Sequence, residues 1–263
     1  MKRKTSLLLL IAIAAVVAVL VEEEHAPRRT RDMVVQETSL EKMTPASASD
    51  SAMEAIIATY RDSIDGIMRE PLCISDFSLR ASRPESPMTR LLADILLDAN
   101  REYAQERHLP LPDMALTNIG GIRDELPKGT VTVGDAFRIA PFENSTVVVK
   151  LDSAGVMDML HHVTQRGGEA LAGAVMTMAD GRATDVRVGG TTLRGGQEYH
   201  VATLDYLATG GDGFEPLVGR EEWRMGVKFR DILIDHLKKL GRDGQHVKPA
   251  ADVRIHTQAS EQK

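Results

Sequence analysis

The sequence contains a single cysteine and lacks the clustered residues that a metal or duplex nucleic acid would require. Cys73 alone cannot form an internal disulfide, and no Cys/His group has the spacing of a structural zinc site. The net charge is −6, and the body of the chain has no block of Lys and Arg to neutralise phosphates. We therefore expect no metal or cofactor in this chain and no duplex nucleic acid as a partner.

Recognisable catalytic motifs are also absent. There is no Gly-x-Ser-x-Gly elbow, no Gly-x-x-x-x-Gly-Lys phosphate loop and no His-Glu-x-x-His motif. His161 and His162 are adjacent, but neighbours on a helix point to different sides, so the two cannot chelate one ion together. No spacing of acidic residues marks a paired-carboxylate site. The sequence alone therefore indicates no catalytic residue.

The first 24 residues have the pattern of an export segment. Basic residues at 2–4 precede an unbroken apolar run over 7–21, and three glutamates follow at 22–24. This order is typical of an export signal whose N-terminus stays in the cytoplasm. The run is shorter than the roughly 20 residues of a membrane span, so a cleaved signal peptide and an uncleaved anchor both remain open. The lack of a small-x-small site after the run favours the anchor, and a buried soluble helix is a third interpretation. We expect an exported protein, periplasmic or on the extracytoplasmic face of the membrane.

The remaining chain predicts one α+β domain. Hydrophobic residues make up 43% of the sequence and charged residues 27%, which is ordinary for a globular protein. We expect a polar linker over 25–52, the domain over 53–241 and a polar tail over 242–263 with one candidate strand. The expected helices cover 53–68, a stretch opened by Ser86-Pro87, 153–162, and 227–240 ended by Gly241. The expected strands are 114–117, a short one from 129, 146–151, 170–178, 184–188 and 199–204.

Two of the predicted strands are each followed by a loop that is suited to ligand binding. In residues 118–123, Gly120 and Gly121 let backbone approach a ligand closely, and Arg123 offers a bidentate fork to phosphate. In residues 206–214, a glycine-rich loop presents Asp212 to sugar hydroxyls beside the ring of Tyr206. Taken singly, each loop is equally explained as a turn, with a surface Arg in one and a capping Asp in the other.

A third loop, residues 141–144, precedes a predicted strand. Phe142 and Asn144 lie two residues apart, so a ring could stack on a base while a carboxamide hydrogen-bonds its edge. The plain alternative is a core Phe and a turn-making Asn.

Together the three loops resemble one family. The C-terminal substrate-recognition domain of the 5'-nucleotidases and UDP-sugar hydrolases is marked by Asn-x-Gly-Gly-Ile-Arg, then Pro-Phe-x-Asn, then an aromatic residue followed by Gly-Gly-Asp-Gly-aromatic. All three motifs occur here in that order, and the resemblance spans residues 79–240. It implies a single layered α/β/β/α domain that binds a nucleotide or nucleoside.

The resemblance also implies roles for individual residues. The base would lie between Phe142 and Tyr206, and Tyr206 stands where Phe is common, so stacking survives while the hydroxyl alters the polar surroundings. The resemblance places Asn144 at the base, Asp212 at the ribose hydroxyls, and Asn118 and Arg123 at the phosphates. The implied substrate-binding set also includes the loop glycines Gly120, Gly121 and Gly211. It further includes Arg83, or alternatively Arg80, because the family has arginines ahead of its first helix.

One part of the family pattern is missing. The full enzymes carry an N-terminal metallophosphoesterase domain with Asp-x-His, Gly-Asn-His-Asp/Glu and Gly-His-x-His motifs, whose two metals activate water and clamp phosphate. None of these motifs occurs in this sequence. The resemblance therefore implies the nucleotide-recognition component of a split 5'-nucleotidase of nucleotide catabolism, with divalent metals and hydrolysis in a separate metallophosphoesterase chain. The alternatives are an exported nucleotide- or nucleoside-binding module without a hydrolytic partner, and a domain that has lost its ligand.

Overall fold

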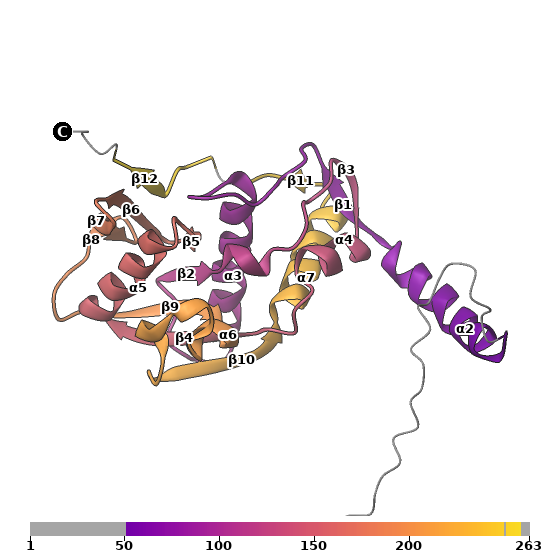
Figure 1. Cartoon of the computed structure of the whole chain (residues 1–263), viewed down its shortest axis with the longest axis horizontal. Coiled ribbons are helices and arrows are strands. Elements are labelled where there is room, and N and C mark those ends of the chain that lie inside the picture. The colour runs from indigo at the N-terminus through magenta and orange to yellow at the C-terminus, as the bar shows by residue number, and fades with distance from the viewer. Residues whose placement is uncertain (1–50, 250, 259–263) are drawn as a thin grey trace, which may run out of the picture. The chain divides into compact units, whose positions relative to one another are not determined.

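A mixed five-stranded sheet separates two hydrophobic cores in the computed structural model, which describes residues 51–249 and 251–258 (Figure 1). Its strand order is β10-β4-β9-β2-β5. These strands are β10 (Glu222–Lys228), β4 (Ser145–Asp152), β9 (Glu198–Leu204), β2 (Met114–Thr117) and β5 (Ala170–Ala172). Successive side chains of a strand point to opposite faces, so β4 sends Val148 into one core and Val147 and Val149 into the other.

Helices cover one face of this sheet. The first core joins the sheet to α3 (Pro87–Glu106), α4 (Val133–Ile139) and α7 (Phe229–Arg242). The start of α3 is fixed by Ser86, whose hydroxyl accepts a hydrogen bond from the Thr89 N–H at 3.2 Å, and by Pro87 in the first turn. The expected helix at Ser86-Pro87 is confirmed.

On the other face, α5 (Ser153–Gln165) lies between the central sheet and a second sheet, as Figure 1 shows. The second sheet has the order β12-β6-β7-β8. Its strands are β6 (Ala174–Ala179), β7 (Arg182–Val188), β8 (Thr191–Thr192) and β12 (Ile255–Thr257). A third, small sheet joins β11 (His246–Val247), β1 (Pro71–Ser75) and β3 (Gly129–Thr132). The mixed, layered α/β architecture is therefore the fold class that the sequence predicts.

The last predicted helix begins and ends differently from expectation. Residues 227 and 228, which the sequence placed in the helix, belong to strand β10 and its pairing with β4, and α7 begins at Phe229. Tertiary pairing overrides local periodicity here. Gly241 does not end the helix, which continues to Arg242; a Cβ at Gly241 would lie 1.9 Å from the Leu72 carbonyl oxygen. This glycine is required by the close approach of α7 to β1.

The expected polar tail is part of the domain. Residues of β11 pair in parallel with β1, and β12 pairs in parallel with β6. Ile255 and Arg254 are buried, and Arg254 forms ion pairs with Asp94 at 2.7 Å and Asp252 at 3.1 Å. The boundary predicted at residue 241 is therefore wrong, and the folded domain extends to Thr257, because two short strands and a buried arginine find distant partners.

Helix α2 (Ser51–Met68) confirms the expected helix at 53–68, and most of its large apolar side chains are exposed. The exposed large side chains of this helix are Met53, Ile56, Ile57, Tyr60, Ile64 and Ile67. Met68 packs against the first core. The N-terminal apolar run lies outside the described residues, as does all but the end of the expected linker. Within 51–249 and 251–258, no helix is both long and apolar enough to cross a membrane.

Candidate functional site

The three predicted loops meet at one edge of the central sheet. Residues 118–123 follow β2, residues 205–214 follow β9, and residues 141–144 precede β4. Strand β9 is parallel to β2 and antiparallel to β4. The ends of the first two strands and the beginning of the third therefore lie on the same side, which brings together segments that are far apart in the sequence.

A cavity of about 360 Å³ opens between these loops. It is lined by Asn118, Gly120, Gly121, Arg123, Phe142, Asn144, Tyr206 and Asp212. Every lining residue belongs to the set predicted from the sequence. Larger clefts lie between α3 and α7 and beside β1, but they do not combine an aromatic pair with glycine-rich loops.

The two rings of the cavity face solvent. Phe142 is 48% exposed and Tyr206 is 41% exposed. The alternative in which Phe142 is a core residue is therefore wrong. Gly211 does not line the cavity, yet it fixes one ring: a Cβ at this position would lie 2.5 Å from Tyr206 Cζ. Only glycine admits the Tyr206 side chain against this backbone. That a base lies between the two rings stays a prediction.

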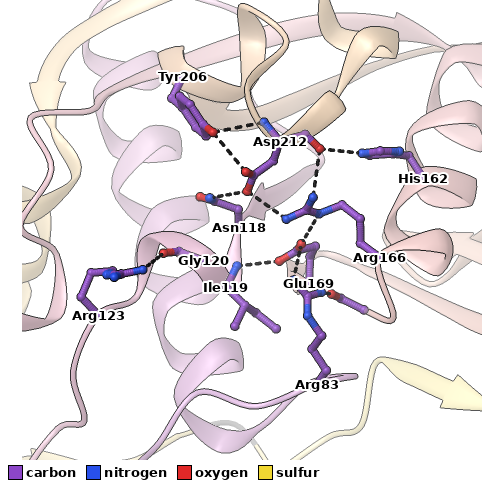
Figure 2. A network of polar contacts seen from close by, with 11 residues as sticks. Arg83, Asn118, Ile119, Gly120, Arg123, His162, Arg166, Glu169, Tyr206 and Asp212 are labelled. Carbon is purple, nitrogen blue, oxygen red and sulfur yellow. Dashed lines mark hydrogen bonds and ion pairs between the residues drawn. The ribbon is translucent and has the colours of Figure 1, made fainter.

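Asp212 is the centre of a polar network at one wall of the cavity (Figure 2). Its Oδ2 accepts hydrogen bonds from Asn118 Nδ2 at 2.7 Å and Arg166 Nη2 at 2.9 Å. Its Oδ1 accepts from the Tyr206 hydroxyl at 3.0 Å. Its carbonyl oxygen accepts from Arg166 Nη1 at 3.0 Å and His162 Nε2 at 2.9 Å. These contacts hold Asp212 at φ 55°, a left-handed backbone that is uncommon for a residue other than glycine.

Asn118 is the buried residue that holds the Asp212 side chain in this wall. It is only 5% exposed, and its amide donates to Asp212, while the phosphate contact that the resemblance implies stays a prediction. The buried Oδ1 of Asn118 has no hydrogen-bond partner among the described residues. A Cβ at Gly121 would lie 2.9 Å from that oxygen, which explains the glycine. The contacts of Asn118 therefore make it a positioning residue for Asp212.

A second carboxylate, Glu169, ties the same wall to two further elements. It is fully buried, and its Oε1 accepts from Arg166 Nε at 2.6 Å and Arg83 Nη2 at 2.9 Å. Its Oε2 accepts from the Ile119 N–H at 2.5 Å, which fixes the loop after β2. A buried carboxylate is tolerated when it is paired and hydrogen-bonded in this way. Figure 2 shows Arg166 between Glu169 and Asp212, so one guanidinium connects two loops.

The charge of Arg166 is set by these neighbours. Burial by itself would lower the pKa of Arg166, but the hydrogen bond from its side chain to Glu169, followed by the charges of Glu169 and Asp212, raises it. The guanidinium therefore stays protonated and can serve as a permanent bridge between the two carboxylates.

The two predicted arginines ahead of α3 lie outside the cavity lining. Arg83 pairs with Glu169 and also donates to the Gly168 carbonyl oxygen. Arg80 is exposed, with its Nε 3.8 Å from Glu125 Oε2. Arg80 and Arg123 together line an adjoining depression of about 340 Å³. Arg123 contributes one donor to the Gly120 carbonyl at 3.2 Å, and among the described residues its other donors have no hydrogen-bond partner, so they are available to an anion.

The opposite wall, residues 141–144, is held through its backbone. Arg230 is buried and donates to the Pro141 carbonyl oxygen at 3.1 Å, while its guanidinium lies 4.2 Å from the centroid of the Phe137 ring. Arg230 and Lys228 also pair with Glu143. Hydrogen bonds from Lys228 and then Arg230 hold the pKa of Glu143 below its usual value. No hydrogen bond in the described part of the chain engages the Asn144 side chain, so this carboxamide is available to a ligand.

The sequence did not reveal Arg166, Glu169, Arg230 or His162 as parts of the site. The segment 166–169 is Arg-Gly-Gly-Glu, in which opposite charges three residues apart flank two glycines. This spacing suits a local ion pair, and it was the one signal present in the sequence. In the described ranges, no group of three or more His, Cys, Asp or Glu residues could hold a metal ion.

Comparison with known proteins identifies the family. The family described as 5'-nucleotidase, C-terminal domain, matches residues 63–219, more than half of the chain. The chain belongs to this family.

Individual relatives match over part of their length. A 5'-nucleotidase of Vibrio vulnificus is 32% identical over 133 residues, which are 48% of this chain and 24% of that protein. Protein UshA of Escherichia coli is 30% identical over 110 residues, 40% of this chain and 20% of that protein. The trifunctional nucleotide phosphoesterase protein YfkN of Bacillus subtilis is 25% identical over 218 residues, 74% of this chain and 14% of that protein. The chain thus matches a quarter or less of these relatives.

Among solved structures, the 5'-nucleotidase precursor of Thermus thermophilus superposes with a TM-score of 0.65 over 82% of this chain and 45% of that one, at 24% identity. This likeness supports the fold of the domain.

Proposed function

We propose that this chain is the nucleotide-recognition component of a 5'-nucleotidase-type phosphohydrolase. The observation that carries the proposal is the cavity lined by Phe142, Asn144, Tyr206, Asp212 and Arg123. It combines two half-exposed rings, a free carboxamide, a carboxylate and a guanidinium. These are the groups that recognition of a base, a sugar and a phosphate would need.

The base occupies the space between Phe142 and Tyr206, with Asn144 at its edge. Stacking on aromatic rings suits any base, because every base has a π-face. The sugar lies against Asp212, which Asn118 and Arg166 hold in place. The phosphate extends towards Arg123, whose donors are mostly unused.

Hydrolysis is the task of a separate metallophosphoesterase chain that carries the divalent metals. Recognition of the base and sugar by this chain would position the phosphate at those metals, so binding energy is converted into orientation. We further propose that the chain works outside the cytoplasm, in keeping with the basic and apolar order of its first 24 residues.

Calorimetric titration with adenosine, AMP and inorganic phosphate tests the binding part. We expect saturable binding of adenosine and tighter binding of AMP, because Arg123 adds a charge-assisted hydrogen bond to the phosphate. In the same samples, AMP should release no phosphate when Zn, Mn, Co or Mg is added. Failure to bind any nucleoside or nucleotide would overturn the proposal, and metal-dependent turnover by a contaminant-free preparation would overturn the separation of recognition from hydrolysis.

Reconstitution tests the partner. A metallophosphoesterase that co-purifies with this chain from its native source should release phosphate from AMP faster when the chain is added back. The stimulation should fall with Phe142→Ala and persist with Asp65→Ala, which alters an exposed pair remote from the cavity. Binding of AMP without any stimulation would instead indicate a nucleotide-binding module that has no hydrolytic partner.

A further inference from the structure

Tyr206 plays two parts at the cavity. Its ring is one of the half-exposed aromatic surfaces, and its hydroxyl lies 3.0 Å from Asp212 Oδ1. The same hydroxyl accepts the Asp212 N–H at 3.2 Å. A phenol has a single proton to donate, and an ionised carboxylate can only accept. The proton of Tyr206 is therefore directed at Asp212 Oδ1.

The acceptor capacity of Asp212 is consequently small. An ionised carboxylate offers about four acceptor sites, two on each oxygen. Asn118 and Arg166 fill both sites on Oδ2. Tyr206 fills one on Oδ1. About one site, on Oδ1, is left for a ligand.

A ribose carries two neighbouring hydroxyls, and both need acceptors if both are to be recognised. One remaining site on Asp212 can accept from one of them. A phenylalanine at position 206 would have the same ring but would leave the second site on Oδ1 open. The tyrosine hydroxyl thus occupies an acceptor site on Asp212 Oδ1 that a second sugar hydroxyl could otherwise use.

We propose that Tyr206 is a specificity-determining residue that makes Asp212 accept one sugar hydroxyl instead of two. This inference rests on the proposed function. The ligands of this cavity then include 2'-deoxyribonucleotides as well as ribonucleotides. The single secondary hydroxyl of a deoxyribose satisfies the one open acceptor as well as a ribose does. Discrimination between the two sugars is weak for this physical reason.

The test compares three ligands on the whole chain: adenosine, 2'-deoxyadenosine and 2',3'-dideoxyadenosine, measured by calorimetry. The wild type should bind the first two within about twofold of each other. It should bind the dideoxy compound about tenfold more weakly, because a hydrogen bond to a charged group is lost. Tyr206→Phe should prefer adenosine over 2'-deoxyadenosine by about tenfold, since the freed site accepts the second hydroxyl.

A matched control is Tyr103→Phe, which removes a phenol hydroxyl in the cleft between α3 and α7. Its ratio of adenosine to 2'-deoxyadenosine affinity should equal that of the wild type. Thermal unfolding of each variant shows that it is folded. Tyr206→Leu, which has no hydrogen-bond donor, provides a second variant should Tyr206→Phe be unstable, and it is judged by the same ratio of the two affinities.

Two results would overturn the inference. One is a wild type that already prefers adenosine over 2'-deoxyadenosine about tenfold, and the other is a Tyr206→Phe variant whose ratio is unchanged. Both differ from the result that contradicts the proposed function itself, in which none of the three nucleosides binds.

Discussion

The two walls of the cavity are built in different ways. The wall that contains Asp212 is cross-linked by side chains: Glu169 and Arg166 connect α5, the loop after β2 and the loop after β9 through buried or half-buried charges. The wall that contains Phe142 is held by Arg230 through backbone carbonyls, and its ligand-facing side chains are free of hydrogen bonds within the described chain.

Because the two walls are held by different contacts, substitutions in them should affect stability and ligand binding differently. Groups that are fixed by a network are preorganised, so a ligand pays little to order them. A free ring on a backbone-anchored loop can adjust to bases of different size. We therefore expect changes in the first wall to affect folding as well as binding, and changes in the free side chains of the second wall, Phe142 and Asn144, to affect binding alone.

The largest effect should come from Glu169→Ala. The substitution leaves Arg166 and Arg83 facing each other without the carboxylate and frees the Ile119 N–H. Breaking a buried ion pair costs about 3–5 kcal/mol of unfolding free energy, and the partial exposure of the two arginines places this case at about 3 kcal/mol. Urea denaturation measures it. Asp65→Ala, at an exposed pair on α2, should change stability by less than about 0.5 kcal/mol; equal losses in the two variants would refute the distinction.

Phe142→Ala should give the opposite result. We expect nucleoside binding to weaken about 5- to 150-fold, because a stacked ring contributes roughly 1–3 kcal/mol per base. The ring is 48% exposed, so the urea midpoint should stay close to that of the wild type. Calorimetry and denaturation on the same preparation check both parts. A variant that unfolds readily but still binds nucleoside would show that this ring is structural after all.

Arg123→Ala should distinguish ligands by charge. If the phosphate lies at Arg123 as proposed, AMP binding should weaken about tenfold while adenosine binding changes by less than about twofold. Measuring both ligands in parallel removes any general effect on the loop. Equal losses for adenosine and AMP would place Arg123 at the nucleoside instead.

The smallest effect concerns Glu143 and pH. Because Lys228 and Arg230 lower its pKa in the folded state, its contribution to stability is present above the ordinary pKa of Glu and is lost as pH falls through the lowered value. The small stability difference between the wild type and Glu143→Gln should therefore be equal at pH 7 and pH 5 and shrink only under more acidic conditions. Denaturation midpoints at a series of pH values test this, and a difference that vanishes by pH 5 would show that the pairs do not hold the loop in solution.

Local sequence patterns predicted the elements that carry the site. Strand β2, strand β4 and strand β9 were expected where they occur, because short continuous runs of apolar and β-branched residues are typical of strands that are buried on both faces. The residues that line the cavity were expected as well, since each loop is a continuous motif and the resemblance spans all three. That these motifs bind a nucleotide stays a prediction.

Partners that are distant in sequence decided the rest. Glu169 reaches Arg83 and Ile119 across 86 and 50 residues, and no local pattern records such contacts. The same reason explains strand β10, which no local pattern predicted and which forms by pairing with β4, and the tail strand β11. The candidate strand of the tail, at 252–256, overlaps β12, but its pairing with β6 was not predicted. Helix α2 is a further example, because its periodicity predicted a helix but could not predict whether its apolar side chains are buried.

By itself, the sequence determined the main helices, the strands that carry the site, the three motifs that line the cavity and the family that they resemble. The tertiary structure decided which arginines hold those motifs in place, that Asn118 supports Asp212, and that the hydroxyl of Tyr206 occupies an acceptor of the same carboxylate. Local propensity and side-chain alternation are properties of neighbouring residues, whereas a hydrogen-bond network depends on which chain segments the completed fold brings within about 3 Å of one another.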